Sequence, residues 1–370
     1  MSKTLQSTAA KRQRNATDRD LMAQLQGVKA IVTANQEALN DALAGSLEDD
    51  SPGTRPGYCV LFDTAALKAR QAEARAEGER QLSAELQEAE TLGAVRRLAK
   101  PPSTAALQAL EQDFPHFAGA LELLRRRFAL ATVTPGLQFS MPPMLLTGDP
   151  GVGKTAFAEA LARALAQPYR RVDIASTTAG FALAGSHSSW NGAKHGAVWS
   201  LLQAPSASGV LLLEELDKAA QSNFPVLGSL YALLEPVSST HFVDEYVGLP
   251  VDASHLVVIA TCNDPGRLDS ALRSRFHELH VPMPDQQQMA AVARSVYRQL
   301  RATRAWTKFF DAELPDFAIE SLQRATPRVV ARTLEEAHAR AAAAGRLRLE
   351  PQDFAVASPV ASERRRIGFV

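Results

Sequence analysis

Gly-Asp-Pro-Gly-Val-Gly-Lys-Thr, residues 148–155, is the stretch that decides the fold of this 370-residue chain. It matches the pattern G-x-x-x-x-G-K-[ST] of a phosphate-binding loop at every fixed position. An apolar run from Met144 to Thr147 comes before it, and residues 156–165 after it have the periodicity and composition of a helix. Strand, glycine-rich loop and helix form the context in which this pattern binds nucleotides. A chance glycine-rich turn is the alternative, and the eight-residue match in this setting disfavours it.

Each part of the loop has an expected task. Its glycines allow backbone N–H groups to converge on phosphate oxygens at a helix N-terminus. Lys154 is expected to reach the β- and γ-phosphates, and the Thr155 hydroxyl is a ligand for Mg²⁺. We therefore expect ATP and Mg²⁺ as ligands. The residues expected to bind the nucleotide are Gly148, Asp149, Pro150, Gly151, Val152, Gly153, Lys154 and Thr155.

Composition disfavours several other classes of protein. With 40 basic and 40 acidic residues the formal net charge is zero, so nucleic acid is an unlikely partner on global charge. The two cysteines, Cys59 and Cys262, are too few and too far apart for a disulfide framework or a zinc site of their own. No run approaches the roughly 18 apolar residues that span a bilayer. We therefore expect a cytoplasmic protein that does not contact a membrane.

The N-terminal region, residues 1–104, is expected to be a mostly helical extension with a disordered tail. Residues 57–62 predict a short strand or a buried apolar patch. Residues 64–99 predict one long, mostly exposed helix, a candidate coiled coil or oligomer contact. The segment Lys-Pro-Pro-Ser-Thr at 100–104 ends the region, because proline breaks a helix.

Residues 105–282 alternate helical stretches with short apolar runs. Strands that alternate with helices predict a parallel sheet covered on both faces. Residues 283–355 predict an all-helical lid domain, and residues 356–370 predict a polar tail. The predicted fold class is therefore α/β, a phosphate-loop domain with a parallel sheet flanked by helices. The runs expected to be strands are 144–147, 170–175, 209–213, 256–261 and 277–281.

The apolar run that starts at Val210 ends in two carboxylates, Glu214 and Glu215. Phosphoryl transfer to water needs an acid that supports the metal and a residue that orients or deprotonates the attacking water. A strand tip beside the phosphate loop would place both carboxylates near the γ-phosphate. Taken alone, the pair could also be a solvated acidic turn.

Three further segments resemble one known family. Residues 212–218, Leu-Leu-Glu-Glu-Leu-Asp-Lys, resemble the L-L-D-E-I-D-K Walker B segment of Lon proteases. Residues 230–236 resemble their A-L-L-E-V-L-D-P stretch, and residues 246–252 their Y-L-D-L-P-F-D stretch. Over residues 105–345 the chain thus resembles AAA+ ATPases, and within them the ATPase module of Lon proteases. The resemblance implies ATP hydrolysis by a homo-oligomer, typically a hexameric ring.

The resemblance assigns roles to the two carboxylates. Glu215 occupies the position of the catalytic acid of Walker B. Glu214 stands where the family has Asp, and this acid supports Mg²⁺ through water. Because its side chain is one methylene longer, the contact with the hydrated ion must be rearranged. We expect hydrolysis to survive this change.

The resemblance also identifies three residues around the γ-phosphate. Asn263, after an apolar run, matches the sensor-1 residue that helps to hold the attacking water, a task suited to an amide that both donates and accepts. Arg275 matches the arginine finger that reaches the ATP of a neighbouring subunit, with Arg273 as the fallback. Arg328 matches the sensor-2 arginine of the lid.

A candidate substrate-gripping loop lies between the phosphate loop and Walker B. Trp190, Asn191 and Gly192 fall where the Lon-like module carries an aromatic pore loop, with Trp in place of Tyr and Asn in place of an apolar residue. A large ring can grip a polypeptide of any sequence by packing. A core or interface role for Trp190 is the alternative. His187 and His195 lack an acidic partner at ligand spacing, so we interpret them as polar loop residues.

Three functions stay open. The leading hypothesis is a Lon-like AAA+ ATPase that remodels or unfolds protein substrates, alone or with a partner protein. We expect no peptidase activity of its own, because too few residues follow the lid for a Ser–Lys peptidase domain. The second hypothesis is a nucleic-acid motor or loader, which neutral charge and the lack of a recognisable nucleic-acid module disfavour. The third is an ATP-dependent switch or scaffold in which Glu214 marks weak hydrolysis.

Overall fold

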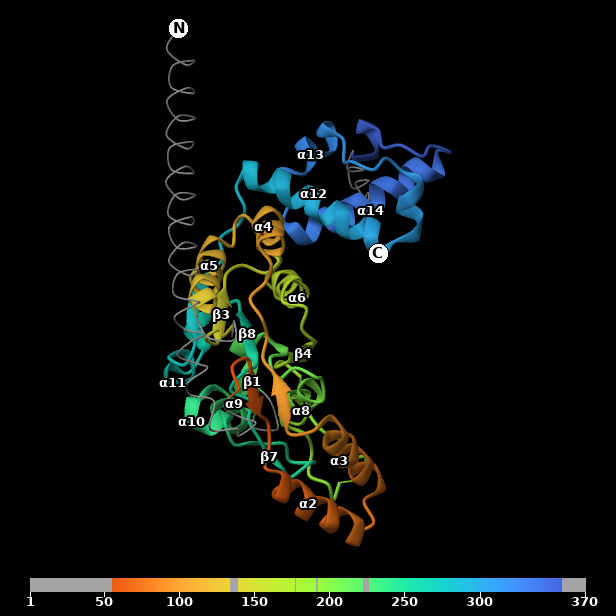
Figure 1. Cartoon of the computed structure of the whole chain (residues 1–370). Coiled ribbons are helices and arrows are strands. Elements are labelled where there is room, and N and C mark those ends of the chain that lie inside the picture. The colour runs from red at the N-terminus through yellow and green to blue at the C-terminus, as the bar shows by residue number, and fades with distance from the viewer. Residues whose placement is uncertain (1–54, 134–138, 177, 191, 222–225, 355–370) are drawn as a thin grey trace, which may run out of the picture.

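The computed structural model describes residues 55–133, 139–176, 178–190, 192–221 and 226–354. The disordered N-terminal tail and the polar tail at 356–370 that the sequence predicts lie outside these ranges. Within them, no helix combines the length and the apolar character needed to cross a membrane. Figure 1 shows an N-terminal part in red and orange, a central sheet with its helices, and a helical C-terminal part in blue.

A five-stranded sheet forms the centre, with the strand order β4-β5-β8-β3-β9. All neighbouring strands are parallel, so each connection crosses over one face of the sheet and helices supply the crossovers. Each strand overlaps the run predicted for it, and the α/β fold class is confirmed. The strands are β3 (Met144–Thr147), β4 (Tyr169–Asp173), β5 (Val210–Glu214), β8 (Val257–Cys262) and β9 (His277–His280).

Two apolar clusters cover the two faces of the sheet. Successive strand residues point to opposite faces, so on β5 Leu212 belongs to one cluster and Leu211 and Leu213 to the other. Both β5 and β8 are buried along their whole length, which explains why their sequences are apolar up to Glu214 and Thr261 near their ends. The cluster around Leu212 is covered by α4 (Thr104–Asp113), α5 (Ala118–Val133) and α6 (Lys154–Ala164). The other is covered by α7 (Ala179–Ala184), α8 (Ala197–Leu202) and α9 (Leu227–Leu234).

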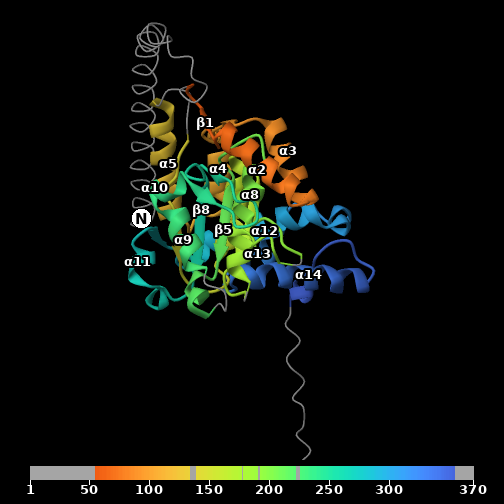
Figure 2. The same ribbon diagram turned by 90° about the horizontal axis from the view of Figure 1, so that it is seen from below.

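Short elements fill the connections that follow β5. They are the 3-10 helices η2 (Leu216–Gln221) and η3 (Pro265–Arg267), the helices α10 (Pro236–Ser239) and α11 (Ser270–Arg273), and the antiparallel strands β6 (Phe242–Val243) and β7 (Pro250–Val251). In Figures 1 and 2 α11 lies on the side of the sheet domain opposite to the C-terminal helices.

The N-terminal part is not the single long helix expected over residues 64–99. Gly78, with φ of 74°, turns the chain back on itself, a conformation that glycine adopts at little cost. Leu67, Leu82 and Leu86 are buried in the same cluster as Leu211, so the apolar residues pack onto the sheet domain. The elements are β1 (Tyr58–Val60), α2 (Thr64–Ala76), α3 (Arg80–Leu92) and β2 (Val95–Arg97), and β1 pairs with β2 antiparallel.

The C-terminal part is all-helical, as expected, and has an apolar core of its own. An ion pair between Arg298 and Asp113, at the end of α4, joins it to the sheet domain. In Figure 1 its helices lie beyond α4 and α6 and far from α2 and α3. They are α12 (Gln286–Thr303), α13 (Asp316–Leu322) and α14 (Pro327–Ala343), with the 3-10 helices η4 (Ala305–Phe309) and η5 (Pro351–Phe354).

Candidate active site

The phosphate loop connects β3 to α6 and depends on glycine at close contacts. Gly148 has φ of 141°, and a Cβ atom there would lie 2.3 Å from the carbonyl oxygen of Val281. Gly151 has φ of 88°, and its Cβ would lie 3.3 Å from Cβ of Arg328 in the lid. The loop is therefore confined between the end of β9 and the start of α14, with its backbone wrapped around the N-terminus of α6.

Lys154 lies under the loop, where only 7% of its surface is exposed. Its Nζ donates hydrogen bonds to the carbonyl oxygens of Gly148 and Asp149 and, at 2.9 Å, to Oδ1 of Asn263. Burial lowers the pKa of Lys154 from its ordinary value. The ammonium group thus connects the phosphate loop to the tip of β8, where the sequence placed a water-holding amide.

The two carboxylates predicted to form Walker B, Glu214 and Glu215, lie at the tip of β5. Glu214 accepts a hydrogen bond from the hydroxyl of Thr155 on one oxygen, and its other oxygen pairs with Arg171 of β4. Glu215 is exposed, has φ of 54°, and its N–H donates to Oγ1 of Thr261 at 3.2 Å. A left-handed backbone is uncommon for a residue with a side chain and is found at functional sites. The two neighbouring acids therefore have separate surroundings, one anchored and one free to face a ligand.

The donor set suits Mg²⁺ held together with a nucleotide. No three His, Cys, Asp or Glu residues in the described ranges are grouped so that they could hold a metal by themselves. Mg²⁺ usually keeps several waters and binds through one or two carboxylates and substrate phosphates. The Thr155 hydroxyl and the Glu214 carboxylate, in contact with each other beside the loop, fit this pattern.

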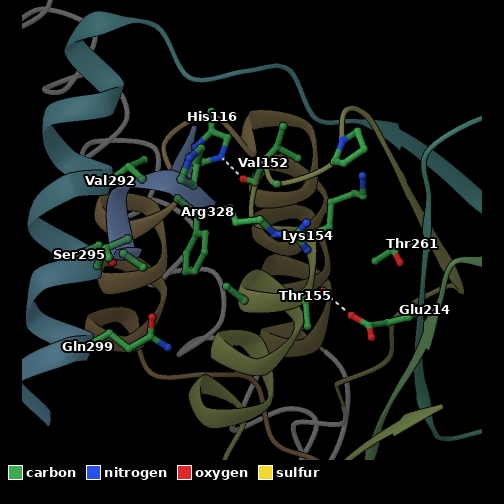
Figure 3. A pocket seen from close by; sticks show the side chains of 18 of the residues that line it. His116, Val152, Lys154, Thr155, Glu214, Thr261, Val292, Ser295, Gln299 and Arg328 are labelled. Carbon is green, nitrogen blue, oxygen red and sulfur yellow. Dashed lines mark hydrogen bonds between the residues drawn. The ribbon is translucent and has the colours of Figure 1, made fainter. Parts of the chain in front are cut away.

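One cavity of about 600 Å³ brings most of the predicted residues together (Figure 3). Lys154, Thr155, Glu214 and Glu215 line it on the sheet side, with Asn263. The lid closes it with Arg328 at the start of α14 and with a face of α12. In Figure 3 α12 lies opposite Glu214, across the loop. The lid residues on α12 and α14 that line the cavity are Val292, Ser295, Val296, Gln299, Pro327, Arg328 and Ala331.

His116, between α4 and α5, lines the same cavity and was missed by sequence reasoning. Its Nε2 lies 2.9 Å from the carbonyl oxygen of Val152, and since a carbonyl only accepts, Nε2 carries the hydrogen. Nδ1 is then an acceptor, and it is buried without a hydrogen-bond partner among the described residues. Burial lowers the pKa of His116, which favours this neutral form.

Arg275 lies outside the cavity. Its guanidinium pairs with Glu235 at the end of α9, donates to the carbonyl oxygen of Ala271, and lies 4.7 Å from the ring centroid of Tyr231. Arg273, the fallback, pairs with Glu278 of β9 at 2.7 Å. The finger candidate is thus directed away from the nucleotide cavity of its own chain.

The Trp190 loop lies between α7 and α8, and 51% of the Trp190 surface is exposed. The indole packs edge to face on Phe181 of α7, with ring centroids 5.0 Å apart. Asn191 lies outside the described residues, and Gly192 lines a second cavity together with Trp190. The exposed indole disfavours the core role that the sequence left open.

Asp244 holds the base of this loop. It is fully buried, and its carboxylate accepts hydrogen bonds from the N–H groups of Gly196, Tyr246 and Val247 at 2.7, 3.0 and 3.2 Å. Burial raises the pKa of Asp244 to about 6. Next to it, His195 lies 2.8 Å from the carboxylate of Glu85 on α3, an acidic partner that the sequence spacing did not reveal. The N-terminal hairpin and the loop base are therefore in direct contact.

Comparison with known proteins accounts for this arrangement. The ATPase family associated with various cellular activities (AAA) matches residues 144–283, from β3 to just beyond β9. The chain contains an AAA ATPase domain. The matched residues include the phosphate loop, Glu214, Glu215, Asn263 and Arg275.

Among curated proteins, the AAA domain is similar to the ATPase region of Lon proteases. Lon protease homolog 2, peroxisomal, of Pichia angusta is 32% identical over 150 residues, which are 40% of this chain and 16% of that protein. A Lon protease of Paraburkholderia phytofirmans is 31% identical over 187 residues, 50% of this chain and 23% of that protein. The chain thus spans less than a quarter of the length of these relatives.

Among solved structures, S. cerevisiae Hsp104 in its casein complex, extended conformation, superposes with a TM-score of 0.53 at 15% sequence identity. The match covers 74% of this chain and 51% of that chain. At this identity the likeness supports the AAA fold alone.

Two signals in the sequence could have revealed more of the site. Parallel strands are usually apolar, so the consecutive cations Arg170 and Arg171 on β4 are unusual for a strand next to β5. A histidine between aromatic residues, as at Phe114, His116 and Phe117, is a second local feature of the sequence that lies at the site. The lining face of α12 has no such signal, because its residues form an ordinary amphipathic pattern.

Proposed function

We propose that this chain hydrolyses ATP to ADP and phosphate with Mg²⁺, and that it works as a ring which remodels or unfolds protein substrates. The observation that carries the first part is the convergence of a buried lysine, a hydroxyl, two carboxylates, an amide and a lid arginine on one cavity. Phosphoryl transfer needs little beyond such positioning and charge stabilisation.

In the proposed reaction each residue has a task at a stated atom. Lys154 Nζ binds the β- and γ-phosphates, and Arg328 contacts the γ-phosphate from the lid. The Glu215 carboxylate takes the proton of a water whose oxygen attacks the γ-phosphorus, while the bond to the β–γ bridging oxygen breaks and ADP leaves. Asn263 orients that water. Bound Mg²⁺, held at Thr155 and near Glu214, would offset the negative charge of the phosphates.

Arg275 supports the ring part of the proposal. It follows α11 directly in the chain and does not line its own chain's cavity. In Figure 2 α11 lies on the side of the sheet domain opposite to the lid helices. If Arg275 acts on ATP, that ATP is therefore bound to another copy of the chain. We propose a hexamer, the common assembly of AAA+ proteins, in which each Arg275 exchanges its Glu235 partner for a neighbour's γ-phosphate.

The exposed Trp190 supports the substrate part. A half-exposed indole on a loop whose base is fixed by Asp244 can press on an extended polypeptide without reading its sequence. We also propose that the chain does not cleave peptide bonds, because the similarity to Lon proteases covers their ATPase region. Casein incubated with protein and ATP should stay intact on a gel, and fragments would contradict this point.

The test is the steady-state ATPase rate of the full chain. Wild-type protein should hydrolyse ATP only with Mg²⁺, Glu215→Gln should bind ATP without turnover, and unfolded casein should raise the wild-type rate. Trp190→Ala should remove the stimulation and keep the basal rate. Stimulation by DNA instead of casein would favour a nucleic-acid motor, and an absence of turnover would favour a switch. A stable ATP-bound monomer in light scattering would contradict the ring.

A further inference from the structure

Arg171 contacts the Walker B acid that departs from the family pattern. Its Nε forms an ion pair with one oxygen of Glu214, while the other oxygen of Glu214 accepts from the Thr155 hydroxyl. The side chain of Glu214 is 12% exposed and that of Arg171 is 57% exposed. Arg171 therefore reaches in from the solvent side and lines the nucleotide cavity together with its partner.

Strand register places Arg171 on the correct face. On β4, Tyr169, Arg171 and Asp173 point to one side, because strand residues alternate. Tyr169 packs in the cluster of Leu212, on the side of the phosphate loop, whereas Val172 packs in the opposite cluster. Arg171 is paired in register with Leu212, one alternation before Glu214. The guanidinium can thus cross to the neighbouring strand tip without distorting either backbone.

The extra methylene of Glu214 makes a second anchor useful. A glutamate has one more rotatable bond than an aspartate, so a hydrogen bond to Thr155 alone would fix one oxygen and leave the other free to turn. An exposed ion pair stabilises a fold by little. This pair has a different effect, because it fixes both oxygens of an acid whose task is to face a hydrated metal ion.

We propose that Arg171 is a positioning residue for Glu214. It holds one carboxylate oxygen while Thr155 holds the other, so that a glutamate at this position can face the hydrated Mg²⁺ ion. This inference rests on the proposed Mg²⁺-dependent ATP hydrolysis. Arg171 acts through Glu214 and not on the nucleotide. Its loss should therefore weaken the response of the protein to Mg²⁺ and leave nucleotide binding without Mg²⁺ unchanged.

The first measurement is the binding of a labelled ADP, detected by its fluorescence. It is made first in EDTA and then with increasing concentrations of Mg²⁺. Arg171→Gln should bind labelled ADP in EDTA as the wild type does. The Mg²⁺ concentration for half-maximal enhancement should rise about fivefold, which corresponds to ~1 kcal/mol, the upper range for an ion pair with an exposed partner. Arg170→Gln is the matched control. Arg170 is the preceding residue on the opposite face of β4 and bonds Ser200, and its variant should match the wild type.

The second measurement is a double-mutant cycle on the ATPase rate with Glu214→Asp. In the wild-type background Arg171→Gln should lower kcat about fivefold with KM for ATP little changed. In the Glu214→Asp background Arg171→Gln should lower kcat by less than about twofold, because the carboxylate of the shorter side chain lies farther from the guanidinium. Equal costs in the two backgrounds would overturn the proposal, and so would unchanged or tighter Mg²⁺ dependence in Arg171→Gln.

Failure of the inference can be told apart from failure of the proposed function. If the wild type hydrolyses ATP and Arg171→Gln matches it in both measurements, only the role of Arg171 is wrong. If the wild type has no Mg²⁺-dependent turnover, the proposed function is wrong, and the binding measurement still decides whether Arg171 governs the response to Mg²⁺. Because Arg171 is exposed, its variant should melt at the wild-type temperature, and a control melt checks this.

Discussion

Nζ of Lys154 lies 2.9 Å from Oδ1 of Asn263. This hydrogen bond joins the phosphate loop, which follows β3, to the tip of the neighbouring strand β8. The amide is further fixed by its backbone, whose N–H donates to Oδ1 of Asp217 at 3.3 Å. When phosphates bind Lys154, Oδ1 of Asn263 can keep its place and its amide N–H₂ can face the attacking water. A residue held in this way orients a reactant at no further entropic cost.

Replacement of Asn263 by Ala should therefore slow turnover and spare binding. We expect kcat to fall about 100-fold, the effect of losing one preorganised hydrogen-bonding group in an active site, with the affinity for ATP within a few fold of wild type. Steady-state ATPase kinetics and a fluorescent nucleotide titration check the two expectations. Lys154→Ala is the contrast, since it should abolish binding. An Asn263→Ala protein with wild-type kcat would remove Asn263 from the reaction.

Arg275 gives a prediction that depends on the ring. Arg275→Ala should lose turnover by about 10³-fold and keep nucleotide binding, because its guanidinium would act on a neighbour's ATP. Lys154→Ala should also be inactive, but it retains an intact Arg275. Mixing the two inactive proteins should restore part of the ATPase rate, since some interfaces would combine an intact loop with an intact finger. No recovery at any mixing ratio, with mixed oligomers shown to form, would place Arg275 outside the reaction.

The sheet and the nucleotide loop could be predicted because their signals are local. A glycine-rich loop, continuous apolar strands such as β5 and β8, and carboxylates at a strand tip all follow from neighbouring residues. The order of the five strands positions Lys154 next to Asn263. This contact was not predicted, and only the family resemblance placed Asn263 near the γ-phosphate in advance.

What could not be predicted depends on contacts between distant segments. The composition of residues 64–99 predicts one helix, whereas the structure has the hairpin of α2 and α3, because a glycine such as Gly78 can stand inside a helix as well as at a turn. Arg171 and His116 entered the site through the register of β4 and the packing of the α4–α5 connection. His195 was interpreted as a lone polar residue, since Glu85 lies 110 positions away in the chain.

The contact between His195 and Glu85 predicts a pH dependence for the docking of the N-terminal hairpin. The hydrogen bond to Glu85 raises the pKa of His195 above its ordinary value. Because the pKa of His195 is higher in the folded state than in the unfolded state, the stability that its contact with Glu85 contributes is fully present below about pH 6.5. This stability is lost as the pH rises through the pKa of His195 in the folded protein. Burial also raises the pKa of Asp244, to about 6. The stability associated with its protonated form is likewise lost as the pH rises through about 6.

A comparison of variants separates the two groups. The free energy of unfolding of wild type minus that of His195→Gln should be larger at pH 6 than at pH 8, by less than about 1 kcal/mol because the pair is partly exposed. The protection factors of the α3 amides, which correct for the base-catalysed rise in intrinsic exchange, should fall between pH 6 and pH 8 in the wild type more than in His195→Gln. Asp244 is present in both proteins, and only its charge interaction with His195 remains in the difference, where it has the same sign as the contact with Glu85. A difference that grows with pH would show that His195 is neutral in the folded protein.

Asp244 itself should be essential to the fold of the loop base. Its carboxylate is the acceptor for three N–H groups, from Gly196, Tyr246 and Val247, in a place without solvent access. Asp244→Ala would leave these donors buried and unsatisfied, at a cost of about 3 kcal/mol or more. Glu245→Ala is the matched control, because the neighbouring side chain is exposed and should change stability little. If Asp244→Ala unfolds at the same urea concentration as Glu245→Ala, the carboxylate does not fix the loop, and the rigidity ascribed to the Trp190 loop must come from Phe181 and the helices around it.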